Sequence, residues 1–318
     1  MEKKFDMYVS GAEFEDLKRQ LGLNQLLSQW NDRQSIEIWG QYLKEHKECT
    51  SKLFIDSGAY TAGNKDIKID IDDYINYINS IDDYVTIFAE LDITPAEVFQ
   101  EDTSLNAFKV SAEKSWNNYL YMIDRVKSVD KLIPVFHAGE DLNYLKKMVE
   151  FRHKDGHLIE YIGLGPGVSE SLTLKVDWFK KCFKVIKESC NPNVKVHAFG
   201  MTSFDVLEEF PFTSADSTSW ILGAAFGRIL VEGRVAITLS NRKQLDSSHL
   251  KNKTKEIQDI VRKKFENLGY NIDDFDNLSP GELRAAMAKF SLVEIATWCN
   301  NYKCNWDNSS QISKNQLW

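Results

Sequence analysis

The sequence predicts an α/β fold, a TIM (β/α)8 barrel followed by a C-terminal helical extension. The chain has 318 residues, and one such barrel typically needs about 250 residues. Short strand-like runs alternate with longer helical patterns, which is typical of βα units around a parallel sheet. Eight candidate strands can be counted along the chain, and eight is the number that the barrel requires.

The candidate strands are short runs rich in apolar and β-branched residues. They are Phe5–Ser10, Leu53–Asp56, Val85–Asp92, Leu132–His137, Glu160–Leu164, Val194–Phe199, Thr213–Asp216 and Val235–Thr238. Between them, apolar residues recur at i, i+3, i+4 and i+7, which indicates amphipathic helices. Such stripes begin at Ile71, Leu142 and Val176, and another helix is expected within residues 94–131. We interpret these stripes as helix faces packed on a core.

The last candidate strand ends just before residue 240 and divides the chain into two parts. We expect a catalytic barrel domain at residues 1–240 and a helical extension at residues 241–318. Within the extension, Ser279 and Glu282 match a capping box, with Pro280 at the first helical position. A helix is therefore predicted to begin there.

Composition and charge limit the classes of function. The net charge is −8, whereas a dedicated nucleic-acid binder is usually basic. Residues 241–264 nevertheless hold eight Lys or Arg against three Asp or Glu. This basic strip is either a solvated helix face or a surface that contacts phosphates.

Location in the cell can be predicted from apolar runs and cysteines. No apolar run reaches the about 18 residues of a membrane span, and residues 1–11 lack the apolar core of a signal peptide. The five cysteines show no regular spacing, which favours reduced thiols over a disulfide framework. We therefore expect a cytoplasmic protein with no membrane partner.

Acidic residues end three of the candidate strands, namely Asp56, Asp92 and Asp216. The carboxyl ends of barrel strands ring one mouth, where active sites form. Carboxylates crowded together raise one another's pKa, which suits acid–base chemistry. Asp56 or Asp92 alone would be explained by capping of the following turn. The convergence of three strand ends favours a functional interpretation.

Histidines and glycines accompany these carboxylates. His137 and His197 lie near the ends of two more candidate strands, and either alone would more often be a hydrogen-bonded core histidine. The run Gly163-Leu164-Gly165-Pro166-Gly167 has the pattern G-x-G-x-G. It therefore lacks a glycine at the third position of the dinucleotide fingerprint G-x-G-x-x-G, and it also lacks the lysine of a P-loop. We interpret it as backbone brought close to a flat ligand.

Taken in order, these motifs resemble the tRNA-guanine transglycosylases and their relatives that insert 7-deazaguanines into DNA. The resemblance covers about residues 50–240. Asp56-Ser57-Gly58-Ala59 resembles the family's Asp-Ser-Gly-Gly motif, the base-recognition aspartate falls on Asp92, and the nucleophile falls on Asp216. Further matches are Pro134-Val135-Phe136-His137-Ala138-Gly139, Tyr161-Ile162-Gly163-Leu164-Gly165 and His197-Ala198-Phe199-Gly200-Met201.

The chain departs from the family pattern at several positions. Ala59 replaces the second glycine, and His137 stands where the family has glutamine. The run Asp216-Ser217-Thr218-Ser219-Trp220 is more typical of the DNA-modifying and phage-borne relatives. The tRNA enzymes carry a structural zinc bound by three Cys and one His. Only Cys299, Cys304 and His249 follow the nucleophile here, so we predict no bound metal.

The resemblance implies a base exchange at C1′ without a redox or nucleotide cofactor. Asp216 would form a covalent bond to C1′. Asp56 would protonate the leaving guanine and then deprotonate the incoming 7-deazaguanine. Asp92 would accept hydrogen bonds from the base. The remaining residues implied to bind the base are Ser57, Gly58, His137, Gly139, Gly163, Leu164, Gly165 and His197.

The resemblance favours DNA over tRNA as the partner, with Lys251, Lys253 and Lys255 of the basic strip along the backbone. Alternatives remain open. They are a tRNA-guanine transglycosylase, a barrel glycosidase or hydrolase of free nucleosides, and a non-catalytic nucleic-acid-binding homologue. The net charge of −8 favours the nucleoside enzyme, whereas the basic strip disfavours it. Retention of all three aspartates disfavours the non-catalytic homologue.

Overall fold

Nine short parallel strands form one sheet in the computed structural model, which describes residues 5–59, 61, 67–95, 98, 106–167, 171–231, 235–239 and 247–306. The two outermost strands, β5 and β6, are separated along the chain only by Pro134. The sheet therefore closes into a barrel, in which β5 and β6 share one of eight strand positions. This confirms the predicted α/β barrel. The strands are β1 (Asp6–Ser10), β2 (Asn24–Ser28), β3 (Leu53–Asp56), β4 (Ile87–Ala89), β5 (Leu132–Ile133), β6 (Val135–His137), β7 (Tyr161–Gly165), β8 (Lys195–Ala198) and β9 (Ser214–Ser217).

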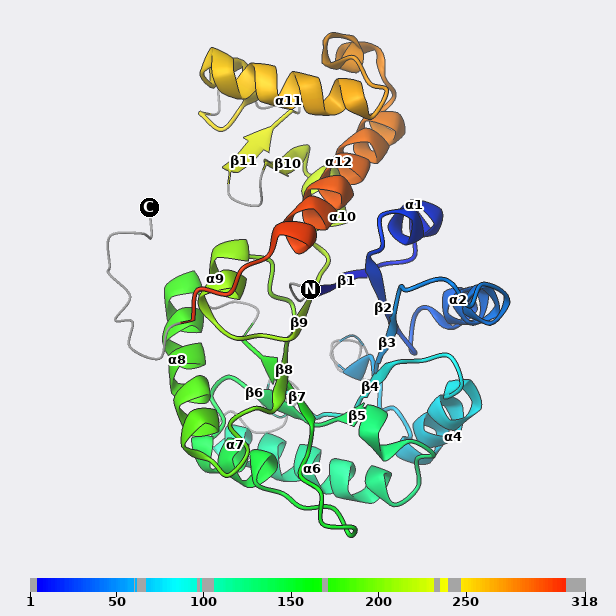
Figure 1. Cartoon of the computed structure of the whole chain (residues 1–318), viewed down its shortest axis with the longest axis vertical. Helices are drawn as coiled ribbons and strands as arrows, with labels where there is room; N and C mark the ends of the chain where they lie inside the picture. The colour runs from blue at the N-terminus through cyan, green and yellow to red at the C-terminus, as the bar shows by residue number, and fades with distance from the viewer. Residues whose placement is uncertain are drawn as a thin grey trace.

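Helices surround the barrel, as Figure 1 shows. The stripes that begin at Ile71, Leu142 and Val176 fall in α4, α7 and α8, so these three predictions are confirmed. The helix expected within residues 94–131 is α6. The helices of this ring are α1 (Glu15–Gln20), α2 (Arg33–Glu45), α4 (Ile71–Ile81), α6 (Asn106–Ile123), α7 (Leu142–Val149), α8 (Leu172–Glu188) and α9 (Phe204–Glu209), with a short 3-10 helix η1 (Val129–Lys131).

Alternate residues of each strand enter two separate apolar clusters. On β1, Tyr8 belongs to a small cluster with Phe54 and Val135, whereas Met7 and Val9 belong to the large cluster. Successive strand side chains point to opposite faces of a sheet, so the small cluster fills the barrel and the large one lies under the helices. The barrel interior is thus a packed core.

The strand β2 was not among the sequence-predicted strands, because two of its five residues are polar and buried. Gln25 donates from Nε2 to the Gly11 carbonyl at 2.8 Å. Its Oε1 accepts from the buried ammonium of Lys18 at 2.9 Å. Asn24 donates to Asp6 and accepts from the Lys52 amide. Buried polar groups are tolerated when they are hydrogen-bonded, so tertiary partners make this polar segment a barrel strand.

The prediction that Val235–Thr238 is the eighth barrel strand is wrong. This segment is β11, and it pairs antiparallel with β10 (Arg228–Val231) in a separate two-stranded sheet. The first and last barrel strands along the chain are β1 and β9, and they pair directly, with Tyr8 opposite Asp216. With β2 included, the eight positions are already filled. The domain boundary expected between residues 240 and 241 falls outside the described residues.

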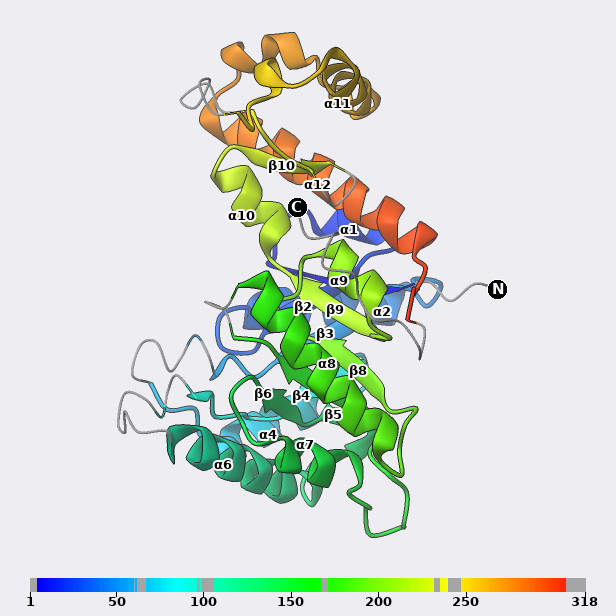
Figure 2. The same ribbon diagram turned by 90° about the vertical axis from the view of Figure 1, so that its left-hand side faces the viewer.

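The C-terminal extension stands on one side of the barrel (Figures 1 and 2). The predicted capping box is confirmed, since the side chains of Ser279 and Glu282 each accept from the other's backbone N–H. In the structure, the extension comprises all elements that follow β9, including three that precede residue 241. These elements are α10 (Ser219–Ala225), the β10–β11 hairpin, η3 (Leu250–Asn252), α11 (Lys255–Asn267), η4 (Ile272–Asn277) and α12 (Pro280–Asn301).

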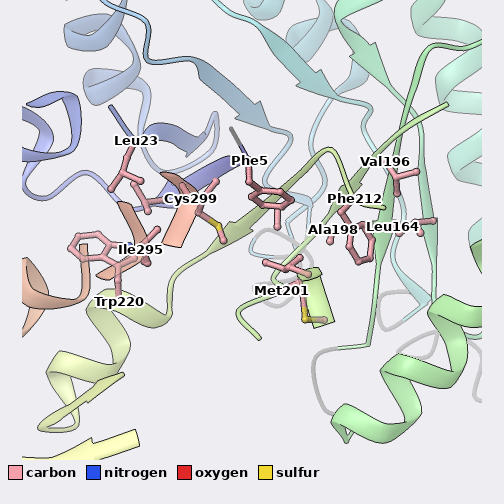
Figure 3. Close-up of a cluster of buried hydrophobic side chains, with 14 of the residues drawn as sticks. Phe5, Leu23, Leu164, Val196, Ala198, Met201, Phe212, Trp220, Ile295 and Cys299 are labelled. Atoms are coloured by element: carbon pink, nitrogen blue, oxygen red, sulfur yellow. The ribbon is translucent and has the colours of Figure 1, made fainter. Parts of the chain in front are cut away.

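A continuous apolar cluster joins the extension to the barrel. Figure 3 shows Trp220 of α10 beside Ile295 and Cys299 of α12, with Phe5 and Met201 of the barrel side in the same cluster. The indole N–H of Trp220 also donates to the carbonyl of Ser10 at 2.9 Å. The extension is therefore fixed to β1, the strand that pairs with the Asp216 strand β9. Across the described parts of the chain, every helix is too short or too polar to cross a lipid bilayer.

Candidate functional site

The three predicted carboxylates lie at the same end of the barrel. Asp56 is the last residue of β3, Asp216 is the third of the four residues of β9, and Asp92 follows β4 by three residues. All these strands are parallel, so their carboxyl ends form one mouth. The negative charges of Asp92 and Asp216 both act on the pKa of Asp56. The structure thus brings together the three residues that the sequence singled out.

The pKa of Asp56 is strongly raised in the folded protein. Burial, followed by the charge of Asp92, raises its pKa to about 7, although the Gly58 amide lowers it. That amide donates to Asp56 Oδ2 at 3.0 Å. Gly58 has φ +80°, and a Cβ there would lie 2.6 Å from the Ser28 hydroxyl, so the turn requires glycine. A carboxyl group with a pKa near 7 can both give and take a proton at neutral pH.

Asp92 lies in a hydrogen-bonded cluster of buried side chains. Ser57 donates from its hydroxyl to Asp92 Oδ1 at 3.1 Å, and His137 Nε2 lies 2.9 Å from Oδ2. The other ring nitrogen, Nδ1, lies 3.3 Å from Glu140 Oε1. Burial opposes the charge on the imidazole, but bonds to both carboxylates outweigh it and raise the pKa of His137 to about 10. His137 is therefore an imidazolium that donates to both acids.

Glu140 was not among the predicted site residues. Its Oε2 accepts from the His137 amide at 2.9 Å, and its Oε1 accepts from the Ser111 hydroxyl of α6 at 2.9 Å. The turn between His137 and Glu140 contains Gly139, which has φ +94°. A glutamate directly after a His-Ala-Gly turn was the available signal, but its contact with Ser111 is a tertiary one.

The glycine run on β7 differs in part from its expected role. Gly163 donates its backbone N–H to the Pro134 carbonyl at 2.8 Å, so this amide is not available to a ligand. The side chain of Leu164 is fully buried in the large apolar cluster, and it is not available either. Gly165 lies closest to the site, since a Cβ there would be 2.9 Å from His137 Cδ2. Glycine at position 165 therefore lets the backbone come close to the imidazole of His137, and not to a flat ligand as expected.

Asp216 is held from three sides. The Gly200 amide donates to its Oδ1 at 2.7 Å, and His197 Nε2 lies 3.3 Å from the same oxygen. The Ser10 hydroxyl of β1 donates to Oδ2 at 3.3 Å. His197 has no exposed surface, so it supports Asp216 from below and does not reach a ligand at the mouth. The base-binding role expected of His197 is thereby replaced by contact with Asp216.

The three lysines of the basic strip lie in the extension. Lys251 and Lys255 are exposed and Lys253 is half-buried. The strip does not directly follow a barrel strand, because residues 235–238, which were predicted as the eighth barrel strand, lie in the hairpin instead. Figure 1 shows α11, which begins at Lys255, at the end of the extension far from α6 and α7.

The residues considered for a zinc site do not fit one. Cys299 is buried in α12, and Cys304 is exposed beyond its end. His249 caps η3 by accepting from the Lys251 amide. Among the residues with described positions, no group of three or more His, Cys, Asp or Glu is arranged to hold a metal ion.

No protein-family model matches the chain, and no curated protein matches it significantly in sequence.

Proposed function

We propose that the protein is a transglycosylase that exchanges guanine for a 7-deazaguanine base in nucleic acid, with Asp216 as nucleophile. One observation carries the proposal: three carboxylates of different environments converge at one barrel mouth. The pKa of Asp56 is raised to about 7, Asp92 is bound by donors, and Asp216 accepts from a backbone amide. Carboxyl groups held in different environments can divide the roles of acid and nucleophile between them.

In the first half of the reaction, Asp216 Oδ2 attacks C1′ while the bond from C1′ to the leaving guanine breaks. Oδ1 already accepts from Gly200 and His197, and Oδ2 has only the longer contact with Ser10. The electron pair of the broken bond stays with the base, which takes the proton of Asp56. The product is an ester between Asp216 and C1′, as in retaining glycosidases.

In the second half, the incoming base loses a proton to Asp56 and attacks C1′, which releases Asp216. The pKa of about 7 suits Asp56 to both directions of proton transfer. Asp92 would select the base, because a carboxylate accepts from the neighbouring N–H groups of a guanine edge. The His137 imidazolium and Ser57 already donate to Asp92. They leave it acceptor capacity for such donors.

We favour DNA as the polymer. The Asp216–Trp220 run resembles that of the DNA-modifying relatives, and the basic strip at residues 241–264 supplies cations for phosphates. The purine must leave the duplex stack to reach the mouth, which costs a few kcal/mol. Lys251 and Lys255 are exposed in the extension, beyond the barrel itself. They would therefore contact the backbone at a distance from the flipped base.

Labelled guanine tests the proposal directly. The protein is incubated with labelled guanine and either double-stranded DNA or tRNA, and the label retained in each polymer is counted. We expect wild type to label DNA, and Asp216→Ala to label neither. Asp273→Asn, which removes an exposed carboxylate paired with Arg262, is the control and should label DNA as wild type does. Label in tRNA alone would refute the choice of polymer, and label in neither would refute the exchange.

A further inference from the structure

A series of side-chain hydrogen bonds crosses the interior of the barrel and ends on Asp216. The Tyr161 hydroxyl lies 2.5 Å from Ser214 Oγ, which lies 2.5 Å from His197 Nδ1. The opposite ring nitrogen, Nε2, lies 3.3 Å from Asp216 Oδ1. Tyr161 and Ser214 are the first residues of β7 and β9, whereas Asp216 lies near the carboxyl end of β9. These hydrogen bonds therefore run from the amino-terminal ends of the strands to the mouth of the barrel.

The surroundings of His197 keep its ring neutral. His197 and Ser214 have no exposed surface. The rings of Tyr8, Phe54 and Phe199 meet the imidazole at steep angles, with centroids 5.9, 4.8 and 4.5 Å away. Burial in this aromatic shell lowers the pKa of His197, and Asp216 only partly opposes the change. A neutral imidazole carries one N–H, so its two nitrogens must have different roles.

The partners of the ring decide which nitrogen carries the proton. A carboxylate only accepts hydrogen bonds, so Nε2 carries the hydrogen and donates to Asp216. Nδ1 is then an acceptor, and the Ser214 hydroxyl must donate to it. The Ser214 oxygen in turn accepts from the Tyr161 hydroxyl. Every member of the chain is satisfied in this one direction, and the reverse direction would place a lone pair of Nε2 against the carboxylate.

We propose that His197, oriented by Ser214 and Tyr161, is a positioning residue that presents a neutral Nε2–H to Asp216 and so directs Oδ2 toward the mouth. This inference rests on the proposed function, in which Asp216 is the nucleophile. A neutral donor fixes the carboxylate without neutralising its charge, whereas an imidazolium would form an ion pair and weaken the nucleophile. The other histidine of the site differs in this respect. The imidazolium of His137 is hydrogen-bonded to Asp92, and Asp92 is not the nucleophile in the proposed reaction.

Nitrogen-15 NMR of the imidazoles tests the arrangement without any substrate. The protein has six histidines, and the signal lost in His197→Gln identifies residue 197. We expect a neutral ring at pH 7 that is protonated at Nε2, with a hydrogen-bonded Nδ1 whose signal moves in Ser214→Ala. An Nδ1–H form or an imidazolium at residue 197 would overturn the inference. This measurement decides the question even if wild type exchanges no base.

Kinetics test the positioning role. By analogy with outer-shell partners that orient metal ligands, we expect His197→Phe to slow ester formation on the order of 10- to 100-fold with KM unchanged. His197→Gln keeps an N–H donor and should recover part of the rate, and Ser214→Ala should give a smaller loss in a well-folded protein. Ser291→Ala removes another buried hydroxyl, which donates to the Met287 carbonyl in α12, and should match wild type.

The outcomes separate the two proposals. Unchanged ester formation in both His197→Phe and Ser214→Ala, in an active enzyme, would overturn the positioning role and leave the exchange reaction standing. A wild type that forms no ester, but whose His197 is neutral and protonated at Nε2, would refute the exchange reaction and leave the arrangement around Asp216 standing.

Discussion

The carboxyl group of Asp56 is less stable as an anion in the folded chain than in water. Its burial beside Asp92 and Asp216 raises the pKa from 3.8 to about 7. An unfolded chain loses this proton near pH 4, whereas the folded chain keeps it until about pH 7. The folded state therefore binds more protons between these limits, and stability from this group falls as pH rises.

We predict that Asp56→Asn stabilises the fold while abolishing base exchange. The amide cannot ionise, so the variant escapes a penalty that grows from about pH 4 to pH 7 and amounts to a few kcal/mol above it. Urea unfolding at pH 4 and pH 8 checks this. The variant should gain stability over wild type at pH 8 and little at pH 4. An equal difference at both values would contradict the burial-raised pKa.

Asp92 is expected to govern which base enters, and not how tightly the polymer is bound. Asp92→Ala removes the carboxylate to which both His137 and Ser57 donate. We predict that the variant loses its preference for guanine over adenine while its affinity for DNA changes little. Competition between labelled bases measures the preference, and fluorescence anisotropy measures DNA affinity. Retention of guanine preference would exclude Asp92 as the base-selecting group.

At the scale of elements, Pro134 separates β5 from β6, and a side chain of the neighbouring strand region binds the backbone at this break. Pro134 interrupts the strand position, and the Val135 amide donates to Glu90 Oε1 at 2.7 Å. Glu90 is fully buried, and burial raises its pKa well above the usual value. The break ends two residues before His137, so Glu90 fixes the backbone that carries the His137–Asp92 contact.

Two glycines of β7 offer a matched pair of substitutions. A Cβ at Gly165 would lie 2.9 Å from His137 Cδ2, whereas one at Gly163 would lie 2.4 Å from the Phe199 ring. We predict that Gly165→Ala moves His137 and lowers guanine preference with little loss of stability. Gly163→Ala should instead destabilise the barrel interior by about 1–3 kcal/mol through overpacking. Thermal unfolding and base competition on both variants decide this, and equal effects on both readouts would contradict the assignment.

Strand predictions succeeded where a segment's own residues determine its structure and failed where tertiary partners do. The predicted runs that overlap β1 and β3–β8 are mostly apolar and were recognised. Strand β9 was also recognised, although three of its four residues are polar. Segment Asn24–Ser28 was missed because Lys18 and other distant groups satisfy its polar side chains. Segment Val235–Thr238 was correctly predicted as a strand but misplaced, since the sequence does not show which strand closes the barrel.

At the scale of the whole molecule, closure of the barrel explains why part of the site was predictable. Strand ends meet at one mouth in any parallel barrel, so Asp56, Asp92 and Asp216 could be grouped from the sequence. Glu140 and Ser214 could not be assigned, because their roles depend on side-chain contacts with His137 and His197. Such contacts require the relative rotation of side chains in the folded barrel, which strand patterns do not specify.

The extension is the part of the molecule that we expect to contact the polymer backbone. Each phosphate neutralised by a lysine releases counterions, so the log–log dependence of affinity on salt should have a slope of about −0.9 per contact. We predict that replacing Lys251, Lys253 and Lys255 together by Gln flattens this slope without changing base preference. Salt titrations of DNA binding measure it, with Lys154→Gln, an exposed lysine paired with Asp124 on the barrel, as control. Identical slopes in wild type and the triple variant would make the strip a solvated face.

The covalent intermediate tests the central claim most directly. Wild type is mixed with DNA in the absence of incoming base, denatured, and digested, and the modified peptide is mapped by mass spectrometry. We predict a deoxyribose-linked peptide with the bond on Asp216, formed by wild type and absent from Asp216→Ala, while Asp273→Asn forms it normally. An intermediate mapped to another residue, or the same yield in Asp216→Ala, would contradict the assignment of Asp216 as the nucleophile of base exchange.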